Sequence, residues 1–434
     1  MSDRARVSVR IAGIVQGVGF RPFVYRTAAA AGVGGYVRNA SGVVDAAFEG
    51  ERAAVESVLE TIRSDSPPLS RVDAIDATWV DPIGADGFEI RESAAGDDTS
   101  GSSGVPVPPD TGLCERCLAD LRDPESRYQG YWATSCVDCG PRLTIVRDVP
   151  FDRDRTSMAE FPLCDGCRDR YEDPADRRYH AQAVACATCG PTLRYETSGD
   201  IVAECGPTAL ERAGAALDDG AIVGIKGIGG THLVCDATAP AAVDRLRERT
   251  GRPTKPFAVM ASSLDTVRSF AAIDATERTA LADVRRPIVV LERSSDAAWL
   301  ERVAPGRHTV GVMLPYAGIH HLLFDHVDGP LVMTSANRPG EPMVTTADEL
   351  WTRLGDVVDG ALAHDREIVT RCDDSVVRVI DGERRFLRRS RGWTPTALPN
   401  PATPADGTAP SILALGPERD VTVAAADGDR VVPS

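Results

Sequence analysis

The chain has 434 residues, which at roughly 150 residues per domain favours about three domains over one. A composition of 43% apolar and 26% charged residues excludes a wholly disordered protein, and no apolar run approaches the ~20 residues that span a bilayer. The formal charge of −16 argues against bulk binding of nucleic acid. No signal peptide is visible, so we predict a cytoplasmic protein without a membrane partner. The acidity could reflect a salty cytoplasm or GC-rich coding.

Composition changes divide the chain. Stretches rich in small residues and proline predict linkers at 93–109 and 396–410. We therefore predict a first domain at 1–92, a cysteine-rich region at 110–190, a long domain at 200–395, and the start of a further domain at 411–434. The predicted class is multidomain, with α+β and α/β parts.

The first 92 residues alternate as a small α+β sandwich does. The predicted order is strand, helix, hairpin, helix and closing strands, at Val7–Ile14, Pro22–Ala31, Gly34–Asn39 with Val43–Glu49, Ala53–Arg63, Val72–Val80 and Phe88–Glu92. This βαββαβ order is the ferredoxin-like arrangement.

A glycine-rich loop joins the first strand to the first helix. Its residues are Val15, Gln16, Gly17, Val18, Gly19 and Phe20, and Arg21 follows at the start of the helix. Glycines let successive backbone N–H groups converge, and a helix N-terminus and a guanidinium add positive charge. The loop alone is compatible with a plain strand-to-helix turn or with a phosphate site.

The strings GIVQGVGFR and GYVRNASG together resemble the acylphosphatase family over nearly all of residues 7–92. The resemblance implies that Arg21 binds an acyl phosphate and that Asn39 orients the attacking water. The chemistry is consistent, since hydrolysis of a mixed anhydride needs charge neutralisation and a positioned water.

Eight of the eleven cysteines form two CxxC-x18-CxxC modules that repeat with a period of 50 residues. They are Cys114, Cys117, Cys136 and Cys139, then Cys164, Cys167, Cys186 and Cys189. Two CxxC turns complete a closed tetrahedral site, so we predict two structural zinc ions. Thioredoxin-like redox chemistry is the alternative, but it explains neither the duplication nor the missing βαβ unit.

Other features of the cysteine-rich region complete this interpretation. The net charge from Cys114 to Cys189 is −3, so we expect structural modules or a protein-docking surface and no nucleic-acid partner. We interpret His180 as a packing or hydrogen-bonding residue, because four thiols already complete the second site. The remaining cysteines, Cys205, Cys235 and Cys372, are expected to be buried apolar thiols.

The long domain alternates helices with apolar strands, predicted at 221–225, 257–260, 287–291 and 331–334, and therefore reads as a mixed α/β sheet. Polar stretches at strand ends are either turn chemistry or parts of a nucleotide site. The strings KPFAVM, LPYAGIHHLLF, TSANRPGEP, RCDDSV and RRSRGWTP resemble the YrdC-like family. That resemblance implies ATP binding with Mg²⁺ through a KxR and SxN pattern, here Arg252, Ser335 and Asn337, with Lys255 as a nearby cation. Thr250 replaces the first lysine of the pattern.

Acylphosphatase, paired zinc modules and a YrdC-like domain in one chain resemble the HypF carbamoyltransferase family. The resemblance implies hydrolysis of carbamoyl phosphate, adenylation of the carbamate with ATP, and transfer to the C-terminal cysteine of a HypE-like acceptor protein during hydrogenase maturation. Leu413–Gly416 looks like the first strand of the sugar-kinase-like transferase domain, so we expect a C-terminally truncated chain or one completed by a second chain. Two alternatives are a threonylcarbamoyl-AMP synthase of tRNA modification and a zinc-ribbon scaffold with decayed catalytic domains.

Overall fold

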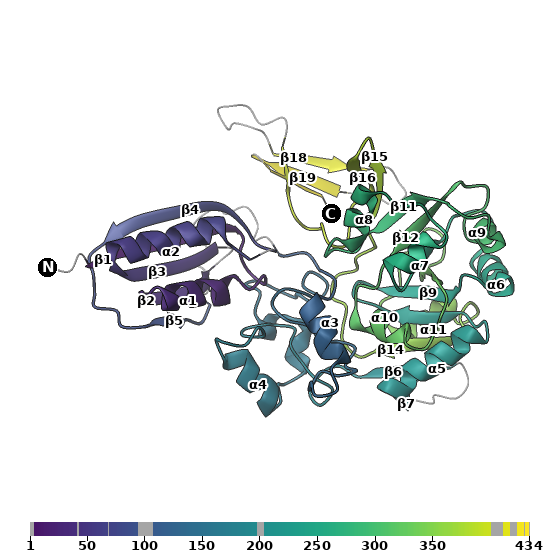
Figure 1. Ribbon diagram of the computed structural model, residues 1–434, viewed down its shortest axis with the longest axis horizontal. Coiled ribbons are helices and arrows are strands. Elements are labelled where there is room, and N and C mark those ends of the chain that lie inside the picture. The colour runs from purple at the N-terminus through teal and green to yellow at the C-terminus, as the bar shows by residue number, and fades with distance from the viewer. Residues whose placement is uncertain are drawn as a thin grey trace.

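The computed structural model describes residues 4–40, 43–67, 69–93, 107–197, 204–400, 411–416, 423–428 and 430–433. Most of the expected linkers, at 94–106 and 401–410, lies outside these residues. Figure 1 shows the N-terminal sheet on one side, the large α/β body on the other, and the cysteine-rich region between and below them. No helix in the described ranges is long and apolar enough to cross a bilayer.

The N-terminal domain is a five-stranded sheet covered by two helices. Its elements are β1 (Arg4–Ile14), α1 (Phe20–Ala30), β2 (Gly34–Ala40), β3 (Val43–Glu51), α2 (Arg52–Ser64), β4 (Arg71–Val80) and β5 (Phe88–Ile90). The order β4-β1-β3-β2-β5 contains the ferredoxin-like order, with β5 added parallel to β2. The predicted fold class is therefore confirmed, and the apolar sides of the strands and helices form one separate core.

The cysteine-rich region consists of two copies of one backbone motif. Its elements are α3 (Glu115–Arg122), the 3₁₀ turns η1 (Arg153–Arg155) and η2 (Ser157–Glu160), and α4 (Asp165–Glu172). The backbone N–H of Gly130 donates to the carbonyl of Leu121 at 3.0 Å, and that of His180 donates to Tyr171 at 2.9 Å. Donor and acceptor of the second bond each lie 50 positions after their counterparts in the first, so the sequence repeat is also a structural repeat.

The large domain is built on a mixed sheet of eleven described strands, in the order β16-β15-β11-β12-β10-β13-β9-β8-β14-β6-β7. Its strands are β6 (Leu193–Glu196), β7 (Glu204–Cys205), β8 (Val223–Lys226), β9 (Thr231–Asp236), β10 (Ala258–Met260), β11 (Ile288–Glu292), β12 (Thr309–Met313), β13 (Leu331–Ser335), β14 (Gly360–His364), β15 (Val376–Ile380) and β16 (Glu383–Arg388). Its helices are α5 (Pro207–Asp218), α6 (Pro240–Thr250), α7 (Leu264–Arg268), α8 (Ala275–Ala282), α9 (Ala298–Val303), α10 (Gly318–Leu323) and α11 (Ala347–Leu354).

Strand β6 follows the last CxxC-Gly-Pro directly and pairs antiparallel with β14. The second cysteine module therefore leads straight into the large sheet. The four strands that were expected in the long domain correspond to β8, β10, β11 and β13. Cys235 and Cys372 are buried as predicted, whereas the side chain of Cys205 lies outside the described residues.

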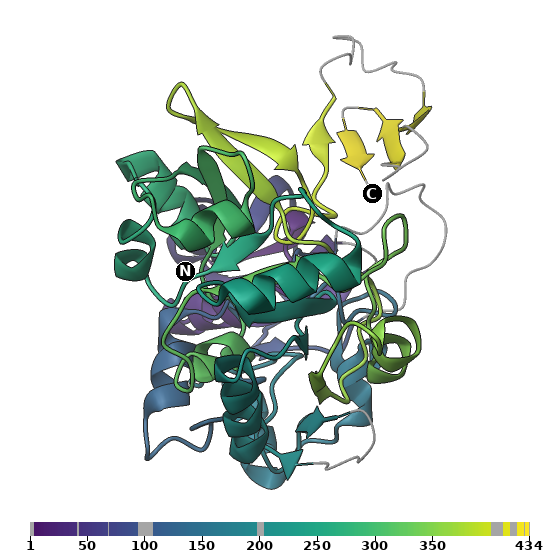
Figure 2. The same cartoon turned by 90° about the vertical axis from the view of Figure 1, so that its right-hand side faces the viewer.

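A small C-terminal sheet ends the described chain. It contains β17 (Leu398–Pro399), β18 (Ile412–Leu415), β19 (Val423–Asp427) and β20 (Arg430–Pro433). Figure 2 shows these strands beside the large body, next to the ribbon of its last hairpin. The strand expected at Leu413 is β18.

Candidate active sites and metal centres

The phosphate loop lies between β1 and α1. Gly17 and Gly19 adopt φ angles of 66° and 73°, the left-handed region that side chains disfavour. The side chains of Val15, Val18 and Phe20 are buried in the domain core, which anchors the loop while its glycines turn. Buried apolar residues thus fix the loop to the core, and the glycines between them allow its backbone to turn.

Arg21 is the second residue of α1, and its side chain is only 8% exposed. Its Nη2 donates to Oδ1 of Asp152 at 2.9 Å, and Ser93 donates to the other carboxylate oxygen of Asp152. Asp152 belongs to the segment between the two cysteine modules. The predicted anion-binding arginine therefore already has an anionic partner within the chain.

Asn39 is fully buried in β2, and neither its Oδ1 nor its Nδ2 has a hydrogen-bond partner among the described residues. A buried amide without partners costs roughly 1–3 kcal/mol unless a water or ligand binds it. Such an amide is suited to hold a water molecule.

The first cysteine module covers the phosphate loop. Arg142 donates from Nε to the carbonyl of Gly17 at 2.7 Å and from its Nη atoms to Gly140 and Val137. The backbone N–H of Phe151 donates to Oε1 of Gln16 at 3.4 Å. A Cβ on Gly17 would lie 2.7 Å from the Phe151 ring, so this glycine is also required by close packing.

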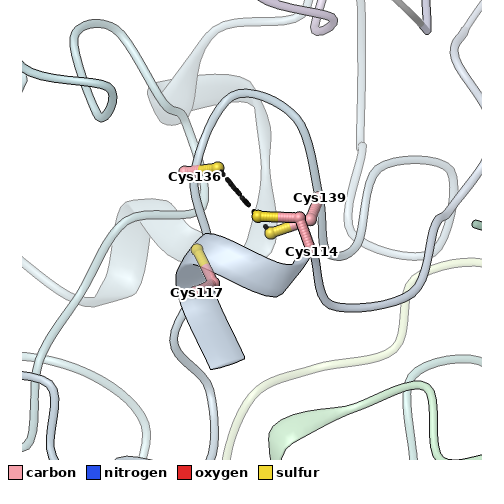
Figure 3. A group of neighbouring side chains, drawn as sticks. All are labelled: Cys114, Cys117, Cys136 and Cys139. Carbon is pink, nitrogen blue, oxygen red and sulfur yellow. Dashed lines mark hydrogen bonds between the residues drawn. The ribbon is translucent and has the colours of Figure 1, made fainter. Parts of the chain in front are cut away.

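Each cysteine module gathers four sulfur atoms within 4.8 Å of one another. Figure 3 shows the first set, with the sulfurs of Cys114, Cys117, Cys136 and Cys139 turned toward one another from α3 and the following loop. The Cys114–Cys136 and Cys136–Cys139 sulfur distances are both 3.8 Å. A tetrahedral zinc ion with Zn–S bonds of about 2.3 Å requires sulfurs about 3.8 Å apart, so the predicted thiol set fits zinc.

Each module contributes an arginine that donates hydrogen bonds to cysteine sulfurs of the other module. Arg127 of the first donates to the sulfurs of Cys164 and Cys186 at 3.2 and 3.5 Å, and Arg177 of the second donates to Cys117 at 2.8 Å. Arg178 also lies over the ring of Tyr128 at 3.7 Å. Guanidinium groups offset the negative charge of four thiolates around one divalent ion.

The large domain has a cavity of about 540 Å³. Its polar lining residues are His232, Lys255, Arg307, Thr309, Thr334, Ser335, Asp373, Asp374 and Arg388. Two of the predicted ATP-binding residues, Lys255 and Ser335, line it directly. A cavity of this size with cationic and hydroxyl side chains is suited to a nucleotide.

The other two predicted residues flank the cavity. Arg252 donates to Oδ1 of Asn337 at 2.9 Å and to Thr334 at 2.9 Å, and Ser335 donates to the same Asn337 oxygen at 2.6 Å. The structure thus brings Arg252, Ser335 and Asn337 into one network. Thr250 instead bonds to Leu246 within its own helix, at 2.5 Å.

His232 was not predicted as a site residue, and Asp374 was singled out only as part of the polar string RCDDSV, without a role of its own. His232 Nε2 lies 2.8 Å from Asp374 Oδ2, and Arg391 donates to Oδ1 of the same carboxylate at 2.8 Å. Burial would raise the pKa of Asp374, but Arg391 and His232 outweigh it and lower the pKa well below its usual range. His232 Nδ1 has no partner among the described residues. The signal available in the sequence was the acidic pair after β14.

Three family models match the chain. They are acylphosphatase over residues 7–90, HypF finger over 113–146 and 163–196, and the Sua5/YciO/YrdC model, described as telomere recombination, over 215–390. Carbamoyltransferase HypF2 of Cupriavidus necator is 46% identical over 99% of this chain and 54% of its own length. The chain belongs to the HypF family.

Further comparisons agree with this family assignment. A crystal structure of full-length HypF in a phosphate- and nucleotide-bound form superposes with a TM-score of 0.91 at 38% identity, covering 99% of this chain and 55% of that one. The acylphosphatase of Natronomonas pharaonis is 48% identical over 99% of its own length and 21% of this chain. The chain spans about half the length of the HypF relatives it matches.

Proposed function

We propose that this chain hydrolyses carbamoyl phosphate at the loop of residues 15–20 and adenylates the resulting carbamate with ATP in the cavity of the large domain. In the complete HypF system the carbamoyl group would pass to a HypE-like acceptor protein and become the cyanide ligands of nickel–iron hydrogenase. The observation that carries this proposal is that one chain holds an anion site and a nucleotide-sized cavity. The full-length HypF structure with phosphate and nucleotide supports the same pair of ligands.

In the first step, Arg21 would neutralise the phosphoryl oxygens together with the backbone N–H groups of the loop. The buried Asn39 amide would hold the attacking water through the two atoms that have no protein partner. Water adds to the mixed anhydride, the bond between the carbamoyl and phosphoryl groups breaks, and carbamate and phosphate leave. A positioned water and neutralised charge suffice, so no protein nucleophile is needed.

In the second step, a carbamate oxygen would attack the α-phosphorus of ATP, and pyrophosphate would leave. Lys255 and Ser335 line the cavity and would contact the phosphates, and Mg²⁺ would enter with ATP as part of the substrate. Arg252 and Asn337 hold Ser335 in place and present further donors at the edge of the cavity. The two four-cysteine sites would hold zinc as structural ions, because four thiolates leave no coordination position open.

The test measures phosphate and pyrophosphate release separately. Carbamoyl phosphate should be hydrolysed without ATP, and ATP should yield AMP and pyrophosphate only when carbamoyl phosphate is present. Arg21→Ala should abolish both, whereas Arg26→Ala on the exposed side of the same helix should leave both unchanged. Asn39→Ala should chiefly lower kcat.

Ser335→Ala combined with Asn337→Ala should abolish pyrophosphate formation and spare phosphate release, because the two sites are separate. ATP turnover driven by threonine and bicarbonate would instead favour a threonylcarbamoyl-AMP synthase. Unchanged phosphate release in Arg21→Ala would refute the first step.

A further inference from the structure

The cavity beside Arg21 is lined from two domains. Gly17 and Gly19 of the phosphate loop and Arg21 of α1 come from the first domain. Both zinc modules line the rest, with Arg142 from the first and His180 and Gln182 from the second. The two domains are also packed together here, since the rings of Tyr25 on α1 and Tyr179 lie 5.9 Å apart. The wall opposite the phosphate loop is therefore built by the cysteine-rich region.

Gln182 lines this cavity and has an unused hydrogen-bond donor. Its Oε1 accepts from the backbone N–H of Arg153 and from the Tyr171 hydroxyl, both at 2.9 Å. A backbone N–H only donates, so these bonds fix which end of the amide is oxygen. The residue is 4% exposed, and its Nε2 has no partner among the described residues. A buried N–H₂ group beside an anion site can donate a hydrogen bond to an oxygen atom of a bound ligand.

Asp152 accepts a hydrogen bond from the Arg21 guanidinium, the group that a bound anion would also use. Its carboxylate lies 2.9 Å from Arg21 and is also held by Ser93. A phosphoryl group that binds Arg21 through two oxygens competes with this carboxylate for the same donors. His180 stays neutral beside them, because burial and Arg21 lower its pKa to about 4.

We infer that the second zinc module completes the phosphate site: Gln182 Nε2 donates to an oxygen of the bound phosphate ester or anhydride, and Asp152 is the internal anion that this ligand displaces from Arg21. The ligand class is a small phosphorylated acid or its phosphate product. The inference rests on the proposed function for the identity of the substrate only. Its contacts are to the phosphate group itself, so inorganic phosphate serves as the probe.

The experiment is calorimetric titration of the full chain with inorganic phosphate, and the signal lost in Arg21→Ala defines binding at this site. Gln182→Glu keeps the oxygen that accepts from Arg153 and Tyr171 but replaces the free donor. It should weaken phosphate binding about tenfold or more. The matched control is Gln129→Glu, the same change at an exposed residue of the first module, which should bind as the unaltered chain does.

Asp152→Asn should tighten phosphate binding about tenfold, because the competing charge is removed while the side-chain shape is kept. Asp154→Asn, an exposed acid in the same segment, is the control and should bind normally. Phosphate affinity within about twofold of the unaltered chain in Gln182→Glu or Asp152→Asn would overturn the inference, as would loss of zinc in Gln182→Glu. A chain that binds phosphate but does not hydrolyse carbamoyl phosphate would refute the proposed function while the binding comparison still decides this inference.

Discussion

At one position of the repeated zinc module the first copy has Trp132, and the second copy, 50 residues later, has Gln182. Trp132 is buried against the large domain, stacks on His364 with ring centroids 4.3 Å apart, and donates from Nε1 to the carbonyl of Pro191 at 3.1 Å. Gln182 lines the phosphate cavity instead. The first module is part of the core of the large domain and also lines the phosphate cavity through Cys136, Cys139 and Arg142. At this repeat position, however, only the second copy lines that cavity.

The burial of the cysteines follows the same difference. Cys117, Cys136 and Cys139 belong to the largest apolar cluster, which continues into the large sheet. Cys167 and Cys186 belong to a small cluster whose other buried member is Tyr128 and against which the partly buried Leu163, Cys164 and Cys189 pack. The repeat thus contains two equal sets of four cysteines, and the two sets differ in how extensively they pack against the large domain. The predictions below test this difference, from the largest expected effect to the smallest.

Loss of one zinc ligand should separate the modules most clearly. Cys136→Ser and Cys186→Ser should each lower the metal content from two zinc ions to one, because three thiolates no longer close the site. Cys136→Ser should also lower the unfolding temperature of the large domain, whereas Cys186→Ser should leave it nearly unchanged. Elemental analysis and calorimetry check the pair, and equal thermal shifts would contradict the proposed difference.

Trp132→Ala should destabilise the chain by about 3–5 kcal/mol, since it removes a buried aromatic ring and leaves a cavity. Gln182→Ala removes one buried acceptor and should cost about 1–3 kcal/mol. Urea denaturation followed by tryptophan-independent circular dichroism measures both. A larger loss of unfolding free energy in Gln182→Ala than in Trp132→Ala would contradict the stronger packing of the first module against the large domain.

The arginine contacts between the modules predict a smaller asymmetry in metal retention. Arg177→Met should speed zinc release to a chelating dye by about tenfold or more, because its contact with Cys117 is short and charge-assisted. Arg127→Met should have a smaller effect, since its sulfur contacts are longer and it lies in an exposed position. Release of both ions at the unaltered rate in Arg177→Met would refute a role in metal retention.

The smallest effect concerns the left-handed turn of each module. It is glycine in the first, Gly130 with φ 62°, and histidine in the second, His180 with φ 53°. His180→Gly should therefore stabilise by up to about 1 kcal/mol at neutral pH, and Gly130→His should destabilise similarly.

His180 also predicts a pH dependence. Its pKa is lowered to about 4 in the folded chain, so the unfolded chain binds the extra proton between about 4 and 6.5. Stability should therefore fall as the pH drops through this window, and His180→Gly should lose that part of the decline. Parallel thermal scans from pH 7 to pH 4 measure the difference. Identical pH profiles for the two chains would contradict it.

The sequence alone determined the features that depend on neighbours along the chain. The two thiol tetrads follow from CxxC spacing, because each turn presents two sulfurs locally, and the 50-residue period fixes their equivalence. The order of strands and helices in the first domain follows from apolar alternation, and the loop before Arg21 follows from its glycines. Arg252, Ser335 and Asn337 lie in one hydrogen-bonded network, and Lys255 and Ser335 line the cavity, while their binding of ATP stays a prediction.

Only the tertiary structure decided which residues from distant segments share a site. Arg21 and Asp152 are 131 positions apart, and His232 and Asp374 are 142 apart, so no local pattern signals either pair. Trp132 and Gln182 occupy equal places in the repeat, and their surroundings differ because Trp132 packs against His364 of the large domain whereas Gln182 lines the phosphate cavity. Local geometry is encoded within a few residues, whereas a site between domains depends on which surfaces are buried together.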